Sequence, residues 1–168
     1  MENKGEDKGK LEQKYDLLAK KFNELYQAGK ERGGEAMSVA MEKARKQLTS
    51  LGELSEEQGE VFKKYLARDL DQTMVDAQRL GKEAKEKLNP ARLGAGALSS
   101  LATILEFTGS ALTTLSDKTK KSLVYKTGEI TTAGTLTCQD CGNKIHLKET
   151  GHVPPCHKCK GTLFDKGY

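Results

Sequence analysis

CQDCG (138–142) and CHKCKG (156–161) are two C-x-x-C motifs near the C-terminal end, and together they contain all 4 cysteines of the chain. Two residues between the cysteines of a pair allow a tight turn to direct both sulfurs at one ion, and two such turns complete a tetrahedral site. Residues 142–155 separate the pairs, just short of the usual spacing of zinc ribbons. We therefore predict one structural zinc ion per chain, held by four thiolates: Cys138, Cys141, Cys156 and Cys159.

Other uses of these cysteines remain open from the sequence. The same four thiolates suit iron, as in a rubredoxin-like electron carrier, and redox dithiols or disulfides are a third reading. His146, His152 and His157 lie nearby, but four thiolates already complete the site, so we assign the histidines no metal role. Four protein ligands also leave no open position for a substrate. We therefore expect no enzymatic activity and no catalytic residue.

The residues around the motifs predict a small β module over 125–168. Glycines punctuate this part of the chain, and runs such as residues 130–132 and 135–137 favour extended structure. The part that contains the cysteines, residues 134–168, has about 35 residues and lies below the size of about 40 at which an apolar core usually suffices, so metal binding is expected to supply the folding energy. We expect the metal-free module to be largely disordered. Its predicted core consists of Leu136, Ile145, Leu147, Val153, Leu163 and Phe164.

The preceding region, residues 11–124, has the periodicity of helices. Apolar residues recur at steps of three and four from Leu11 to Leu25 and again from Met37 to Leu51, which predicts one helix from residue 11 and a second over 35–51. Residues 1–10 contain acids and lysines but no apolar residue after Met1. We expect those ten residues to form a flexible tail.

Two further helices follow from start and stop signals. Ser55 with Gln58 forms a capping-box pattern, which predicts a long helix from there to Leu88, before Asn89-Pro90. A fourth helix is predicted over 93–115, ending near Lys118, Lys120 and Lys121. Only about half of 93–115 is apolar, so we expect a packed helix and no membrane span.

Composition agrees with a helical protein of modest core. The chain has 168 residues, a net charge of +4, 36% hydrophobic, 5% aromatic and 31% charged residues, and no Trp. These values favour one domain, or one domain plus a module, with elongated helices. The first residues lack the pattern of a secretory leader, so a cytoplasmic protein is expected. The predicted fold class is mostly α: a helical bundle or coiled-coil-like region with a small C-terminal β zinc ribbon.

Several segments resemble a family of small bacterial zinc-ribbon proteins of unknown function. The resemblance rests on GELS (52–55), YLARDL (65–70), DKT (117–119), YKTGEI (125–130) and GTLTC (134–138), with the second cysteine pair and Phe164. It implies a helical, partly coiled-coil region joined to a ribbon whose ligands are the four cysteines, and it implies no established activity. This chain departs from the family pattern in lacking Trp and in placing Lys160, not glycine, directly after the last cysteine.

The leading functional hypothesis is a non-enzymatic interaction or adaptor protein, with a protein partner or a second copy of the chain bound through the helices. A dimer is slightly favoured over a monomer. Nucleic acid is possible but not favoured, because residues 134–168 contain five lysines and three acids, and a zinc–tetrathiolate centre adds about −2. The ribbon then has no net positive charge and few aromatics for stacking.

Overall fold

The computed structural model describes residues 4–93, 96–108 and 123–168. Its helices are α1 (Lys4–Ala28), α2 (Gly34–Ser50), α3 (Glu56–Leu80), α4 (Lys82–Lys87), α5 (Pro90–Leu93) and α6 (Ala97–Thr108). Its strands are β1 (Tyr125–Lys126), β2 (Ile130–Thr131), β3 (Gly134–Cys138), β4 (Lys144–Leu147), β5 (Gly151–His152) and β6 (Leu163–Gly167). The fold is mostly α with a small C-terminal β region, as predicted. We call the described helices the helical body and residues 125–168 the ribbon.

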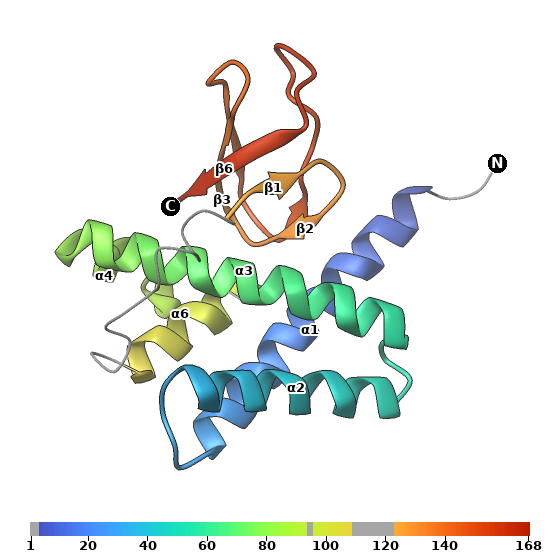
Figure 1. Cartoon of the computed structure of the whole chain (residues 1–168), viewed down its shortest axis with the longest axis vertical. Helices are drawn as coiled ribbons and strands as arrows, with labels where there is room; N and C mark the ends of the chain where they lie inside the picture. The colour runs from blue at the N-terminus through green and yellow to red at the C-terminus, as the bar shows by residue number, and fades with distance from the viewer. Residues whose placement is uncertain (1–3, 94–95, 109–122) are drawn as a thin grey trace.

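The helical body buries the predicted apolar stripes against one another. In Figure 1, α2 and α3 run side by side and α1 crosses them at an angle, with α6 packed near the middle of the body. The rings of Tyr15 and Phe62 meet edge to face with their centroids 5.8 Å apart. Leu18 lies in the middle of the first stripe and is 0% exposed. A dimer therefore has to use a surface other than this stripe.

The start of α3 confirms the capping-box prediction. The Ser55 hydroxyl accepts a hydrogen bond from the Gln58 amide at 3.1 Å, and the Gln58 side chain accepts one from the Ser55 amide at 3.2 Å. Both bonds satisfy amide groups that the first turn of a helix leaves without intrahelical partners. Gly52, which precedes this cap, has φ 75. A left-handed residue there lets the chain reverse from α2 into α3.

Three helix boundaries differ from the predictions. Helix α1 already begins at Lys4, so residues 4–10 extend the helix that we predicted from residue 11. Elongating a formed helix costs little. The long third helix ends at Leu80, because Gly81 takes φ 54 and breaks it before α4. The fourth predicted helix is described only as Ala97–Thr108. Its predicted end and Lys118, Lys120 and Lys121 lie outside the described residues.

The ribbon consists of two small antiparallel sheets. Strands β1, β6, β3 and β4 form one sheet in that order, and β2 pairs with β5. Its core contains Tyr125, Leu136, Cys138, Val153, Cys156 and Phe164, with Ile145 and Leu147 packed against it. Leu163 is 37% exposed, so its predicted place in the core is wrong. Successive strand residues point to opposite faces, and Phe164 already occupies the inner face of β6.

The ribbon stands on the helical body, above α3 and beside the N-terminal part of α1 (Figure 1). Strands β2 and β6 contact α3, β5 contacts α1, and Ile130 of β2 belongs to the core of the helical body. The loops that carry the cysteines lie at the end of the ribbon that points away from the helices. We call that end the tip and the end on the helices the base. Within the described ranges, no helix has both the length and the apolar character needed to cross a membrane.

Candidate metal centre

The tip brings the four predicted ligands together. The sulfur atoms of Cys138, Cys141, Cys156 and Cys159 all lie within 4.8 Å of one another. Two of the separations are 3.5 Å, between Cys138 and Cys159, and 3.6 Å, between Cys141 and Cys156. A tetrahedral ion with zinc–sulfur bonds of about 2.3 Å places its sulfurs about 3.8 Å apart. The spacing and the chemistry of these donors therefore fit a zinc ion.

The first turn, residues 138–142, is closed by a glycine, and we call it the first knuckle. The amide of Gly142 donates to the carbonyl of Cys138 at 2.9 Å, and the amide of Cys138 donates to the carbonyl of Asn143 at 2.9 Å. Gly142 has φ 70, a left-handed conformation that glycine adopts without steric cost. This backbone folds both cysteines of the pair toward the same point.

The second knuckle, residues 156–161, has the same hydrogen bonds but a different residue at the critical position. The amide of Lys160 donates to the carbonyl of Cys156 at 2.9 Å, and the amide of Cys156 donates to the carbonyl of Gly161 at 2.9 Å. Lys160 has φ 63 and is the non-glycine residue with positive φ in the described ranges. A left-handed conformation costs a residue with a Cβ about 1–2 kcal/mol. The knuckle therefore keeps its shape at the expense of strain at Lys160.

Gly161 serves a different purpose from the glycine of the first knuckle. A Cβ at Gly161 would overlap the Asp140 side chain and lie 3.0 Å from the sulfur of Cys138. The Gly161 amide also points to the sulfur of Cys159 at 3.4 Å. The glycine displaced by one position is thus required where the second knuckle packs against the first.

The cysteines differ in exposure and in acidity. Cys138 and Cys156 are buried, whereas Cys159 is exposed. The backbone N–H of Cys159, followed by that of Lys158, lowers the pKa of the Cys156 thiol to about 6. Backbone donors of this kind favour the thiolate, which is the form that binds a metal. These donors therefore favour the anionic form of the Cys156 sulfur.

The three histidines lie outside the sulfur cluster. The Nδ1 atom of His146 is 3.0 Å from the Thr135 hydroxyl, and that of His152 is 3.1 Å from a carboxylate oxygen of Glu12 on α1. The side chain of His157 is exposed on the second knuckle. His152 thus joins the ribbon to the helical body.

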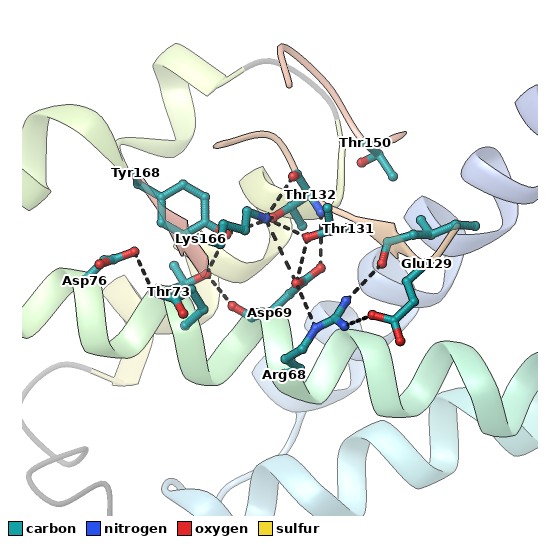
Figure 2. A network of polar contacts seen from close by, with 12 residues as sticks. Arg68, Asp69, Thr73, Asp76, Glu129, Thr131, Thr132, Thr150, Lys166 and Tyr168 are labelled. Atoms are coloured by element: carbon teal, nitrogen blue, oxygen red, sulfur yellow. Dashed lines mark hydrogen bonds and ion pairs between the residues drawn. The ribbon is translucent and has the colours of Figure 1, made fainter. Parts of the chain in front are cut away.

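The base of the ribbon holds a buried polar network that the sequence analysis missed (Figure 2). Asp69 of α3 is 0% exposed. Its Oδ2 accepts from the Tyr15 hydroxyl at 2.5 Å and from the Thr132 amide at 3.1 Å. Its Oδ1 accepts from the Thr131 hydroxyl at 2.8 Å. One carboxylate therefore connects α3 to α1, to β2 and to the residue that follows β2.

The cation of this network is Lys166 of β6. All three protons of its ammonium group find acceptors: the Thr131 hydroxyl at 2.7 Å, the Thr132 carbonyl at 2.8 Å and the Thr132 hydroxyl at 2.6 Å. Its Nζ lies 4.0 Å from Oδ1 of Asp69, and both side chains are 0% exposed. Burial lowers the pKa of Lys166 to about 8, against the opposing effect of Asp69. A buried pair of this kind persists only while its remaining hydrogen bonds are satisfied.

Arg68 makes a second contact between α3 and the ribbon. Its guanidinium group is paired with Glu129, donates to the Ile130 carbonyl at 3.3 Å, and lies 3.9 Å from the ring centroid of Tyr125. From α1, Asp16 accepts from the Thr150 hydroxyl at 2.6 Å and from the Ala97 amide at the start of α6 at 2.8 Å. The base is therefore fixed by polar contacts from two helices.

A periodic signal for part of this network is present in the sequence. Leu66, Asp69, Thr73 and Asp76 follow one another at steps of three and four, so the polar members share the buried face of α3. Arg68 and Asp69 also lie within YLARDL, one of the segments on which the family resemblance rests. Those segments therefore mark the contact between helix and ribbon as well as the metal site.

A small β ribbon with a four-cysteine cluster is the defining feature of zinc-ribbon proteins, and in this chain the ribbon is joined to a helical body. Residues 24–167 match the sequence profile of a family described as a zinc-ribbon containing domain, and the chain belongs to that family. Neither the curated proteins nor the solved structures contain a match to this chain. The family assignment confirms the resemblance drawn from the sequence and carries no characterised function.

Proposed function

We propose that this chain is a non-enzymatic zinc-binding interaction protein of the cytoplasm, in which the ribbon is a recognition element for a protein partner. The observation that carries the proposal is the orientation of the ribbon: its base is bonded to α1 and α3, and its tip points away from them. A fixed base presents the tip in one orientation, which reduces the entropy cost of binding.

The chemistry of the tip supports binding over catalysis. Zinc bound by four thiolates has no open position for a substrate or an activated water, and its contribution is to stabilise the fold. Asp140, His157 and Lys158 have exposed side chains on the two knuckles. A surface with both acidic and basic side chains suits a protein partner better than nucleic acid, because a phosphate backbone is bound by clustered basic side chains.

Metal analysis is the first test. Purified protein is expected to contain one zinc per chain and to be colourless. A red protein with a visible charge-transfer band and reversible one-electron reduction would instead establish an iron electron carrier. A metal content well below one per chain, with four titratable thiols in the native protein, would contradict both assignments.

The recognition role needs a variant that keeps the metal. In crosslinking with nuclease-treated extract of the native host, His157→Ala/Lys158→Ala should lose the protein captured by the wild type while retaining its zinc. Lys43→Ala, at an exposed position on α2, is the matched control and should capture it normally. Equal capture by all three proteins would contradict recognition by the tip, and capture found only in a parallel untreated extract would indicate nucleic acid.

A further inference from the structure

The ribbon's two ends are connected by one pair of strands. In the β3–β6 register, Phe164 lies opposite Cys138 and Lys166 lies opposite Leu136. Phe164 and Lys166 are buried, whereas Leu163 and Asp165 are exposed, so the first two share one face of β6. The strand that packs against a metal ligand at the tip therefore also carries the buried cation of the base.

The ribbon has little apolar material with which to keep these strands ordered alone. Two of its buried core residues, Cys138 and Cys156, are themselves predicted ligands. A small module with so little apolar core usually needs a metal ion to fold. Loss of the ion therefore leaves β3 and β6 with a core that contains uncompensated thiolates or thiols.

The chemistry of the contacts at the base allows the ribbon to separate from α1 and α3. Many of its direct contacts are hydrogen bonds and ion pairs, and the groups that make them are well solvated once they separate from one another. Transfer of Lys166 and Asp69 back to water removes their desolvation cost, which offsets much of the attraction between them. The apolar contacts are few: Ile130 joins the larger core of the helical body, and Ala133 and Tyr168 pack against its smaller cluster. Docking therefore depends on an ordered β6 that holds Lys166 in position.

From this arrangement we infer that metal binding at the tip controls docking at the base: the metal-loaded ribbon stays on α1 and α3, and loss of the metal releases it. The inference rests on the proposed zinc site. Release uncovers a face of α1 and α3 that carries four carboxylates now bonded to the ribbon, namely Glu12, Asp16, Asp69 and Asp76. The fold thus contains a metal-dependent switch between a covered and an open acidic face.

A single tryptophan can report the docking. The chain has no Trp, and Tyr65 of α3 is partly buried, with its ring 5.1 Å from the Arg68 guanidinium. In a Tyr65→Trp variant loaded with zinc, a strong chelator should shift the emission to longer wavelength as the indole becomes exposed, and added zinc should reverse the shift. Unchanged emission, with zinc shown by elemental analysis to have been removed, would overturn the inference.

Reciprocity supplies the second measurement. If metal favours docking by some factor, then docking favours metal binding by the same factor, so weakening the base must weaken metal binding. In zinc competition with a chromophoric chelator, Asp69→Asn should bind zinc about tenfold more weakly than Glu57→Gln, an exposed position on the same helix. Thr131→Val removes bonds to both Asp69 and Lys166 and should act in the same direction.

Far-UV circular dichroism checks that each variant keeps its helices. If either Asp69→Asn or Thr131→Val loses them, zinc affinity is compared in the other of these two variants. Equal zinc affinity in well-folded Asp69→Asn, Thr131→Val and Glu57→Gln proteins would overturn the coupling. A wild-type chain that binds no zinc would instead overturn the proposed function, so the two failures are distinguishable.

Discussion

The tip and the base of the ribbon fix the same two strands, β3 and β6, by different means. At the tip, four sulfur atoms lie close enough together to bind one metal ion, which has to come from solution. At the base, the cation and the carboxylate both belong to the chain, and Thr131 and Thr132 bond to each of them. The tip can therefore be emptied by a chelator, whereas the base can be changed only by substitution or by pH. This difference allows the two ends to be tested separately.

Removal of the metal should have the largest effect, and it should be confined to the ribbon. Structural zinc contributes on the order of 10 kcal/mol to small metal-dependent modules, whereas the ribbon adds only Ile130 to the larger core of the helical body and packs Ala133 and Tyr168 against a smaller cluster, within the described residues. Chelation or Cys138→Ser should abolish the dispersed β-strand amide signals in NMR spectra while the far-UV circular dichroism of the helices persists. A collapse of the helical signal would contradict the independence of the body.

Substitution at the base should have the next largest effect. Asp69→Ala leaves Lys166 as a buried cation without its carboxylate, and breaking a buried pair in this way costs about 3–5 kcal/mol. Urea unfolding of the metal-loaded protein measures the loss. Asp69→Ala/Lys166→Met removes both charges and should recover part of it. The alternative outcome is that Lys166→Met lowers the stability of Asp69→Ala as much as it lowers that of the wild type. The two substitutions would then act independently, and the buried pair would not explain the stability lost in Asp69→Ala.

Sequence patterns predicted the tip better than the base. The ligands at the tip follow from the C-x-x-C spacing because both cysteines of a pair lie within one local turn. The start of α3 follows from Ser55 and Gln58 for the same reason, since a cap is completed within one turn of helix. Features decided by neighbouring residues can be predicted from a single sequence.

The base depends on contacts between distant segments, which local patterns do not encode. Lys166 is buried because β6 pairs with β3 and turns its inner face toward Asp69, far away in the sequence. A lysine beside a glycine in a short polar strand gives no local sign of burial. For Asp69 the step of three from Leu66 was a usable signal, but the residues that bond to it come from α1 and the ribbon.

A change of pH should affect the base by a smaller amount. Burial lowers the pKa of Lys166 from 10.5 to about 8. Between these values the unfolded chain holds a proton that the folded chain has released, so the free energy of unfolding rises with pH in this window. The stability of the wild type relative to Lys166→Met should therefore increase from pH 8 to pH 10, by up to about 3 kcal/mol. Urea unfolding of both metal-loaded proteins tests this, and a constant difference would contradict it.

The smallest expected effect distinguishes the two knuckles at the tip. Gly142 and Lys160 occupy the same place after their cysteine pairs, with φ 70 and 63, but only Lys160 carries a Cβ into the left-handed conformation. Lys160→Gly should relieve that strain, and part of the gain is lost to the greater freedom of glycine in the unfolded chain, which leaves about 1 kcal/mol of stabilisation.

Chelator competition should then show tighter zinc binding in Lys160→Gly than in Lys158→Gly, a matched change at an exposed position in the same knuckle. The reverse change at the first knuckle, Gly142→Lys, should weaken binding by a similar factor, because it introduces the strain that Lys160 already bears. Affinity that falls in Lys160→Gly would show that the lysine side chain itself contributes to the site, and that the two knuckles differ in more than backbone strain.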